Sequence, residues 1–290
     1  MCEVVSTGST LRTIGSFIGH ESRPGLRSTA VALPRLISTL MFRWLTAGES
    51  HGPQLTVIID GIPAGLELAS EDLRHDLRRR QGGHGRGERQ KIEVDEARIV
   101  GGVRGGITLG SPIALVILNR DHANWIPEMT PEREGFAPKP VTRLRPGHAD
   151  LAGALKYNHS DVRNVLERSS ARETTSRVAA GGVARKLLDR FGIRIYSFTQ
   201  SIGPVDIGYA CVDPGTLTGD EIESSPVRCP DPQASEAMVK AIDDAAGRGD
   251  TLGGTFRVIV TGCPPVSAAM STGTASWTAG WRKRSSASTR

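Results

Sequence analysis

The densest group of residues able to bind an anion lies between Arg78 and Lys91. This stretch holds six cations, one acid (Glu88) and four glycines. So many guanidinium groups cannot be buried without partners, so we expect the stretch at the surface. Guanidinium groups bind phosphate and carboxylate through paired hydrogen bonds, and glycines let the backbone approach a ligand closely. The composition therefore predicts a clamp for a small polyanion. A solvated basic loop and an arginine–glycine segment that binds RNA are the alternatives.

A second polar cluster runs from Arg145 to Asp150 and contains a histidine on a stiff turn. Pro146 restricts its own φ, whereas Gly147 permits an unusual one. We therefore expect His148 to be held in a defined position, where an imidazole can act as an acid or a base near neutral pH.

The segment Gly48–Gly52 matches the G-x-S-x-G pattern that surrounds the nucleophile of serine hydrolases. That pattern requires a strand before it and a helix after it. Here the residues that follow, 55–60, are short and β-branched and predict a strand, so a hydrolase is disfavoured. His51 on this turn is either an acid or base, or a histidine that caps the turn.

Other cofactor patterns are missing from the sequence. No glycine pattern stands between a strand and a helix as a dinucleotide site requires, and there is no P-loop. The four cysteines show no C-x-x-C spacing, which argues against a zinc site and against a disulfide framework. No metal is expected. The residues whose convergence could still form a metal site are Glu49, His51, His148 and Asp150.

Composition narrows the classes of partner. The chain has 290 residues, 36 Lys and Arg against 31 Asp and Glu, and a net charge of +5. This excess favours anionic ligands but is too small to demand nucleic acid. Aromatic residues make up only 4%, which disfavours base stacking. No apolar run approaches membrane-spanning length. We therefore expect a small-molecule substrate, no nucleic-acid or membrane partner, and a cytoplasmic location.

The elements that position these residues mix strands and helices without regular βαβ spacing, which favours an α+β fold. Strands are expected at 42–46, 55–60, 92–94, 97–100, 113–118, 193–202 and 255–260, and helices at 70–80, 151–157, 167–191 and 235–247. The longest helix has one apolar face and ends at Gly192. Because it is expected to begin at Glu167, Ser169 and Ser170 would lie among the unpaired backbone N–H groups at its start, a natural phosphate pocket.

The order and spacing of six motifs carry a specific resemblance. The motifs are Thr46–Gly52, the Gly-x-Gly-Arg-Gly-x-Arg run at 83–89, Arg145–Asp150, Arg168–Thr174, Gly249–Gly254 and Gly262–Pro265. Together they resemble the chorismate synthase family over residues 41–265. The resemblance implies a β-α-β sandwich fold and a homotetramer. It also implies an anti 1,4-elimination of phosphate from 5-enolpyruvylshikimate 3-phosphate, with reduced FMN required but no net redox change.

The resemblance also implies roles for individual residues. Substrate would be held by Arg80, Arg86, Arg89, Arg145 and Arg172. His148 would protonate the departing phosphate, and His51 would act on the reduced flavin. The flavin-binding segment would be Arg168, Ser169 and Ser170. The positions of Arg80 and Arg86 are linked to NADPH in members that reduce their own flavin, whereas other members need a flavin reductase as a partner. A flavin-dependent oxidoreductase using the same pocket is the rival function.

Both ends of the chain depart from the family pattern. Residues 1–40 lack periodicity, and we expect them to be a non-native or disordered extension, with Met41 as a better start. Residues 266–290 are rich in Ser, Thr and Ala, and our hypothesis is a frameshift just after Pro265. The expected organisation is therefore an extension at 1–40, a partial family domain at 41–265 and an unrelated tail at 266–290. Loss of the family's later Arg-x-Asp segment implies weak FMN binding and impaired activity.

Overall fold

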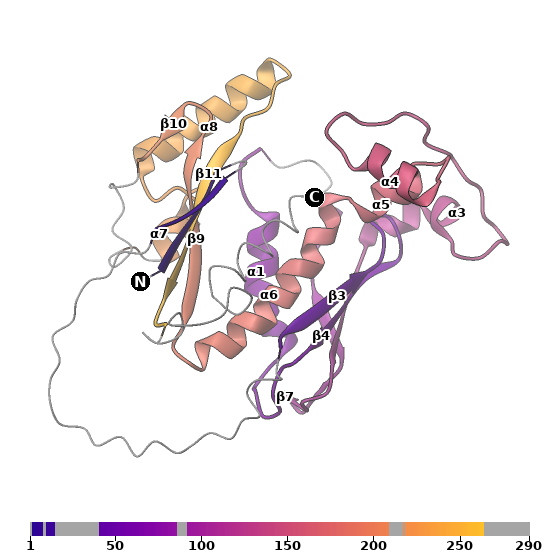
Figure 1. Ribbon diagram of the computed structural model, residues 1–290, viewed down its shortest axis with the longest axis horizontal. Helices are drawn as coiled ribbons and strands as arrows, with labels where there is room; N and C mark the ends of the chain where they lie inside the picture. The colour runs from indigo at the N-terminus through magenta and orange to yellow at the C-terminus, as the bar shows by residue number, and fades with distance from the viewer. Residues whose placement is uncertain are drawn as a thin grey trace, which may run out of the picture. The chain divides into compact units, whose positions relative to one another are not determined.

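The computed structural model describes residues 2–7, 10–14, 41–85, 92–208, 217 and 219–263, and for residues 2–14 it describes the backbone alone. The chain divides into two compact units (Figure 1). One unit comprises residues 30–81 and 87–187, and the other comprises residues 1–29, 82–86 and 188–290. Both units combine a β-sheet with helices, so the predicted α+β class is confirmed.

The unit formed by residues 30–81 and 87–187 is built on a four-stranded antiparallel sheet of order β3-β4-β8-β5. Its strands are β3 (Arg43–Ala47), β4 (Gln54–Asp60), β5 (Ala97–Gly101) and β8 (Ile113–Leu118). A two-stranded ribbon, β6 (Val103–Arg104) with β7 (Ile107–Thr108), connects β5 to β8 along the chain. The strands predicted at 42–46, 55–60, 97–100 and 113–118 are therefore confirmed.

Two helices cover one face of this sheet, α1 (Ser70–Gln81) and α6 (Thr174–Asp189) (Figure 1). Successive residues of a strand point to opposite faces, so Val57 and Leu115, paired across β4 and β8, lie on the same face. Both are fully buried, in the same core as Val183 of α6. Alternate residues of the strands thus pack with the apolar face of α6 in one core.

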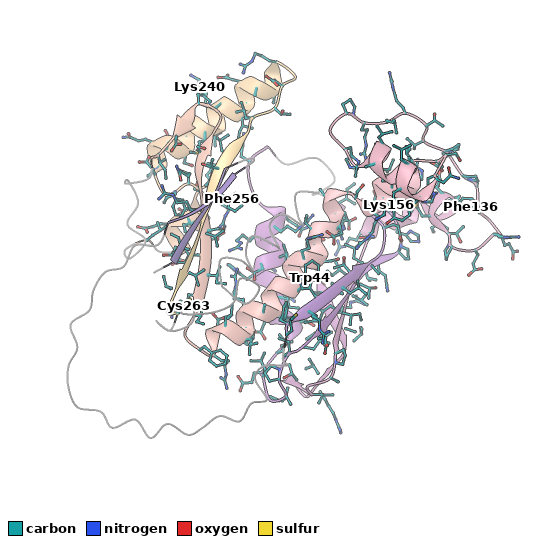
Figure 2. All side chains as sticks on the ribbon, viewed as in Figure 1. Trp44, Phe136, Lys156, Lys240, Phe256 and Cys263 are labelled. Carbon is teal, nitrogen blue, oxygen red and sulfur yellow. The ribbon has the colours of Figure 1, made fainter. Side chains whose placement is uncertain are left out.

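Polar contacts hold these two helices together outside the core. Lys186 contacts Asp72 at 2.7 Å, and Arg185 contacts Asp76 at 3.0 Å. Trp44 lies where β3 meets α6, with the guanidinium carbon of Arg177 at 5.2 Å from its ring centroid (Figure 2). The position of α6 is therefore defined against both the sheet and α1.

The prediction of one helix over residues 167–191 is wrong at its start. The structure has α5 (Arg163–Arg168), a 3₁₀ turn η3 (Ala171–Glu173), and only then α6. Ser170 has extended backbone angles, φ −62° and ψ 150°, and its side chain accepts a hydrogen bond from the N–H of Arg172. Such a side-chain cap starts a new helical segment instead of continuing the previous one. Ser169 and Ser170 consequently lie in the break between two helices.

The strand predicted at 92–94 is also wrong, because residues 93–96 have no regular structure. Glu93 and Asp95 are buried at 4% and 1% exposure, and their carboxylates bind arginine side chains. Buried charges need such partners, and this requirement overrides the local strand pattern. Residues 121–140 are largely irregular, although they contain short helices. The described residues of this unit also form η2 (Arg120–Asn124), α3 (Ile126–Met129) and α4 (Asp150–Tyr157).

The other unit contains a five-stranded sheet of order β10-β9-β11-β1-β2. The strands are β1 (Cys2–Thr7), β2 (Thr10–Ile14), β9 (Arg194–Ile202), β10 (Val205–Asp206) and β11 (Gly254–Thr261). The helices are α7 (Gly219–Ser224) and α8 (Pro232–Gly247). Phe198 of β9, Met238 of α8 and Ile259 of β11 share a core. This confirms the predicted strands at 193–202 and 255–260 and the helix at 235–247.

Two short strands near the start of the chain join this sheet: β1 pairs with β11, and β2 pairs with β1. The organisation expected for residues 1–40 stays a prediction. β1 thereby pairs with the backbone groups on the edge of β11 that β9 leaves unpaired. The predicted tail, 266–290, lies outside the described residues and stays a prediction. Within the part of the chain that the structure describes, no helix has the length and apolarity needed to cross a membrane.

Candidate active site

The first component of the site is the turn that leaves β3 and carries His51. Gly48 has φ +105°, and a Cβ there would lie 2.4 Å from the carbonyl oxygen of Gln54. Asn119, from the end of β8, donates from its side-chain amide to the carbonyls of Glu49 at 3.0 Å and Gly52 at 2.7 Å. The turn is followed by β4 and not by a helix, which agrees with the rejection of a serine hydrolase. Glycine geometry and a buried amide thus fix the position of His51.

The imidazole of His51 is held by Glu167 of α5. Nδ1 of His51 lies 2.9 Å from both carboxylate oxygens, and the backbone N–H of His51 donates to Oε2 at 2.9 Å. The ring stacks on Trp125, with the centroids 4.2 Å apart. Nε2 lies 3.7 Å from Oδ2 of Asp121, beyond hydrogen-bond distance. Because a carboxylate only accepts hydrogen bonds, Nδ1 carries a proton and Nε2 can exchange one.

Burial and hydrogen bonding act in opposite directions on Glu167. Its side chain is only 2% exposed, and burial alone raises the pKa of a carboxyl group. Hydrogen bonds from the side chain and backbone of His51, together with the charge of Arg163, outweigh burial and lower the pKa of Glu167. The group that faces His51 is therefore a carboxylate at neutral pH.

The segment predicted to bind flavin lies against the same turn. Arg168 donates to the carbonyls of Thr46 at 2.8 Å and Gly48 at 3.2 Å. The hydroxyl of Ser50 donates to that of Ser170 at 3.0 Å. Ser169 is exposed, and its hydroxyl donates to the carbonyl of Val165 at 2.7 Å. The structure thus brings Arg168 and Ser170 together with the turn of His51.

Arg172 lies in a buried network instead of an open pocket. Its side chain is 5% exposed and forms an ion pair with Asp95. Nε donates to Oδ1 of Asn119 at 2.9 Å, and Nη2 donates to the carbonyl of Leu118 at 3.3 Å and lies 3.5 Å from Glu93. These contacts occupy its donors with groups of the protein. Arg172 therefore supports the segment that follows Ser170, and no contact in the structure assigns it to substrate.

Arg80 joins the same network from the end of α1. It donates to Asp95 at 3.1 Å, to the hydroxyl of Thr174 at 3.0 Å and to the carbonyl of Ala171 at 2.9 Å. Arg80 thus lies beside the break between α5 and α6 that contains Ser169 and Ser170. Two further arginines of the predicted clamp, Arg86 and Arg89, lie outside the described residues.

The second histidine forms its own pair with a carboxylate. Asp150, the first residue of α4, is fully buried and accepts hydrogen bonds from Nδ1 of His148 and from Nε of Arg145, the latter at 3.1 Å. The Arg145 guanidinium, against the opposing effect of burial, lowers the pKa of Asp150 to about 2. Asp150 is therefore ionised and orients His148 through Nδ1.

Close packing connects the helices that carry the two carboxylates. Gly153 of α4 faces Val165 of α5, and a Cβ at Gly153 would lie 2.3 Å from Cγ1 of Val165. Asp150 begins α4 and Glu167 lies near the end of α5. The contact at Gly153 thus controls the spacing between the two helices on which both histidines depend.

Sequence reasoning quoted both carboxylates but did not assign them as histidine partners. Only closeness in sequence to other site residues could have pointed to them: Asp150 follows His148 by two residues, and Glu167 immediately precedes Arg168. Asn119 and Asp95 had no signal, because they reach the site only through the pairing of strands. A metal site built from Glu49, His51, His148 and Asp150 does not form. Among the described residues, no three His, Cys, Asp or Glu side chains are placed to hold an ion.

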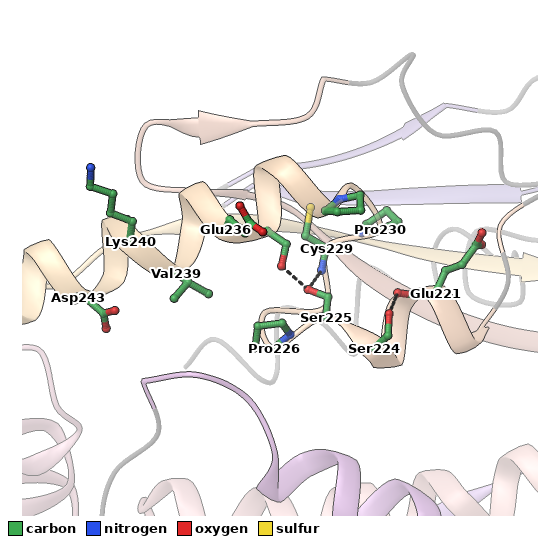
Figure 3. A pocket seen from close by; sticks show the side chains of 12 residues that line it. Glu221, Ser224, Ser225, Pro226, Cys229, Pro230, Glu236, Val239, Lys240 and Asp243 are labelled. Atoms are coloured by element: carbon green, nitrogen blue, oxygen red, sulfur yellow. Dashed lines mark hydrogen bonds between the residues drawn. The ribbon is translucent and has the colours of Figure 1, made fainter.

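Each unit contains a cavity among its described residues. One cavity of about 410 Å³ lies beside α5 and is lined by Glu49, Arg163 and Glu167, next to His51. The other, of about 550 Å³, lies between α7 and α8 (Figure 3). There the Ser225 hydroxyl accepts the N–H of Cys229 at 3.0 Å, and burial raises the pKa of the Cys229 thiol. That thiol is therefore protonated at neutral pH. Of these two cavities, the one beside α5 adjoins Glu167, the partner of His51.

Comparison with known proteins agrees with the resemblance of the motifs. Residues 42–270 match the family model for chorismate synthase. Chorismate synthase of Rubrobacter xylanophilus is 54% identical over 226 residues, which cover 78% of this chain and 57% of the relative. That of Geobacillus thermodenitrificans is 56% identical over 228 residues, covering 77% and 58%. A crystal structure of a chorismate synthase matches with a TM-score of 0.60 and 42% identity, covering 76% of this chain and 58% of that one. The chain thus spans less than two thirds of the length of these relatives, and it belongs to the chorismate synthase family.

Proposed function

We propose that this protein carries out the chorismate synthase reaction. In that reaction, 5-enolpyruvylshikimate 3-phosphate loses its phosphate and a ring proton in an anti 1,4-elimination that gives chorismate. The observation that carries the proposal is the position of His51. It is held by a buried carboxylate and lies beside Arg168 and Ser170, within a chain that belongs to the family.

The chemistry of the substrate matches the arginines of the chain. A phosphate and two carboxylates carry several negative charges, and guanidinium groups bind both kinds of anion. We assign substrate binding to Arg80, Arg86, Arg89 and Arg145. Arg172 acts indirectly in this proposal, because its buried ion pairs hold the segment between α5 and α6.

His148 is assigned to protonation of the leaving phosphate. Asp150 accepts a hydrogen bond from Nδ1, so Nε2, which lies 3.0 Å from Nη2 of Arg145, is the ring nitrogen that would exchange a proton with a ligand. The adjacent Arg145 remains 50% exposed and can contact the same phosphate while it stabilises Asp150. One arginine and one histidine would thus bind and protonate the leaving group together.

Reduced FMN is the proposed cofactor, held by Arg168, Ser169 and Ser170. A guanidinium and two hydroxyl groups can donate to the phosphate of a flavin nucleotide, and Ser169 is exposed at this position. Such binding would replace the contacts that Arg168 and Ser169 make with backbone carbonyls. When bound, reduced flavin supplies electron density to the allylic system without net oxidation. His51 would hold or move a proton at Nε2 beside it. NADPH at Arg80 and Arg86, or a separate flavin reductase, would supply the reducing equivalents.

Anaerobic incubation with reduced FMN and 5-enolpyruvylshikimate 3-phosphate tests the proposal. We expect phosphate and chorismate in equal amounts, at the low rate that weak FMN binding implies, while the flavin absorbance stays that of the reduced form. Oxidation of flavin in step with product would favour an oxidoreductase. Absence of both phosphate release and substrate binding would overturn the proposal. The alternative of RNA binding predicts an affinity that falls steeply with salt.

We also propose a homo-oligomer in the cytoplasm. The sheet face opposite α1 and α6 carries exposed apolar side chains: Leu45 (71%), Val100 (62%), Leu118 (44%) and Ile58 (39%). An exposed apolar sheet face is a common site of subunit contact. Leu45→Glu should shift the mass measured by light scattering toward the monomer, whereas Leu155→Glu on the exposed side of α4 should not. An unchanged mass in the Leu45→Glu variant would contradict this use of the face.

A further inference from the structure

We propose that Glu167 is the positioning residue of His51. Its carboxylate fixes both the orientation of the ring and the tautomer, so that Nδ1 keeps a proton and Nε2 exchanges one. The geometry of the pair stands on the contacts described above. Only the expected effect of the Glu167–His51 pair on turnover rests on the proposed function.

The contact differs from an ordinary surface ion pair in two ways. First, Glu167 is 2% exposed, so water does not compete for its oxygens. Second, it binds His51 at two places, the backbone N–H and ring Nδ1, each at 2.9 Å. The main chain of Glu167 adds a third connection, because its carbonyl accepts the N–H of Ser50 at 3.0 Å. One residue thus determines where the turn lies and which way its imidazole faces.

The groups around the ring leave Nε2 as the reactive nitrogen. Trp125 covers one ring face, and Arg163, whose guanidinium carbon lies 5.1 Å from the Trp125 ring centroid, also contacts Glu167 at 3.4 Å. Asp121 is the charged group toward Nε2, at 3.7 Å. From η2, the ring of His122 contacts the backbone carbonyl of His51 at 2.9 Å, not its ring. Tautomer control therefore comes from Glu167.

Glu167→Gln makes this control testable through hydrogen-bond direction. The backbone N–H of His51 needs an acceptor, so the carbonyl oxygen of the new amide faces it. Both carboxylate oxygens lie 2.9 Å from Nδ1, so the amide NH₂ group that replaces Oε1 comes within reach of Nδ1 as a donor and favours Nδ1 as an acceptor. The imidazole proton should therefore move to Nε2. Glu167→Asp keeps the negative charge on a side chain that is one methylene shorter. We expect part of the His51 population to keep its proton on Nδ1 in this variant.

The experiment is ¹⁵N NMR of imidazole-labelled protein without ligands at a pH where His51 is neutral, with its signal assigned from a His51→Asn variant. We expect the Nδ1–H form in the unsubstituted chain and the Nε2–H form in Glu167→Gln. The matched control is Glu128→Gln, another buried acid that lines the same cavity but pairs with Lys139. It should leave the His51 signals unchanged.

The outcomes separate positioning from catalysis. An Nε2–H form in the unsubstituted chain overturns the proposal without any variant, even if Glu167→Gln fails to fold. An unchanged tautomer in folded Glu167→Gln also overturns it. In turnover assays, we expect kcat to fall by about 10²-fold with little change in KM, since acid–base groups contribute roughly 10²–10⁴. A tautomer switch without a change in kcat would support positioning by Glu167 and contradict the role of His51 in the proposed function.

Discussion

The carboxylate of Asp150 accepts a hydrogen bond from Nδ1 of His148, two residues before it, and is fully buried at the first turn of α4. Glu167 makes the same kind of contact with His51 from α5. In both pairs the carboxylate is buried and the histidine is partly exposed, at 25% for His148 and 18% for His51. The protein therefore uses buried acids to orient two imidazoles through Nδ1.

Asp150→Asn should weaken both the fold and the orientation of His148. The substitution removes the charge that binds Arg145 and replaces one acceptor oxygen with a donor. We expect a loss of about 1–3 kcal/mol in the free energy of unfolding, the usual result of leaving buried polar groups without partners. Urea unfolding at neutral pH measures it. Glu132→Gln, on an exposed loop, serves as the control and should change the stability very little.

The same carboxylate predicts a dependence of stability on pH. Because the folded-state pKa of Asp150 is about 2, below its ordinary value of 3.8, its contribution to stability is present above about pH 4. That contribution is lost as the pH falls from about 4 to 2, and the lowered pKa of Glu167 acts in the same direction. The difference in the free energy of unfolding between the unsubstituted chain and Asp150→Asn should therefore be smaller at pH 3 than at pH 7. An equal difference at both pH values would contradict this assignment.

Gly153→Ala should separate α4 from α5. The added Cβ would lie 2.3 Å from a methyl group of Val165, so one of the two helices must shift. We expect a loss of about 1–3 kcal/mol, as for other overpacked sites, measured by denaturant unfolding. Gly181→Ala is the matched control, because it replaces a helical glycine of α6 with no atom within 4 Å. It should stabilise the protein by about 0.5–1 kcal/mol through helix propensity. An equal change in stability for Gly153→Ala and Gly181→Ala would contradict a clash between residue 153 and Val165.

Gly48→Ala should displace the turn that carries His51. Here the added Cβ would meet the backbone oxygen of Gln54 at 2.4 Å, and φ is +105°, so both a clash and strain arise. Gly65→Ala has a similar φ of +89° with nothing within 4 Å, so it measures the strain alone. We expect Gly48→Ala to be the more destabilising of the two and to broaden or shift the imidazole signals of His51, as NMR can show. If Gly65→Ala lowers the free energy of unfolding by as much as Gly48→Ala, the positive φ alone, and not the close approach of the turn to β4, explains the need for glycine at position 48.

Arg172→Lys should be strongly destabilising although it conserves charge. A lysine ammonium cannot reproduce the planar contacts to Asp95, Asn119 and the Leu118 carbonyl. Breaking a buried ion pair typically costs about 3–5 kcal/mol, and thermal or urea unfolding should show a loss of that order. Arg98→Lys, an exposed position on β5, is the control and should have little effect. A loss in Arg172→Lys no larger than in the control would mean that the network does not support the fold.

Much of the architecture could be predicted because it depends on local patterns. The short β-branched run at 55–60 and the apolar run at 113–118 predicted the central strands, and the acids and arginines at the two ends of 70–80 predicted α1. The failures have a common cause. The strand expected at 92–94 and the helix start expected at Glu167 were both replaced by segments whose polar side chains bind groups distant in sequence, such as Asp95 with Arg172. Local propensity is a weak term that such buried contacts override.

The sequence alone determined the family, the α+β class and the residue types of the site, because motif order and periodicity are properties of the chain itself. Tertiary structure decided which partners these residues have. It placed Glu167 beside His51 across 116 positions of sequence and buried Arg172 among acids from other segments. It also put Ser170 at a helix break. Hydrogen bonds between groups far apart in sequence form only when the sheet and its helices are assembled, so no local pattern could reveal them.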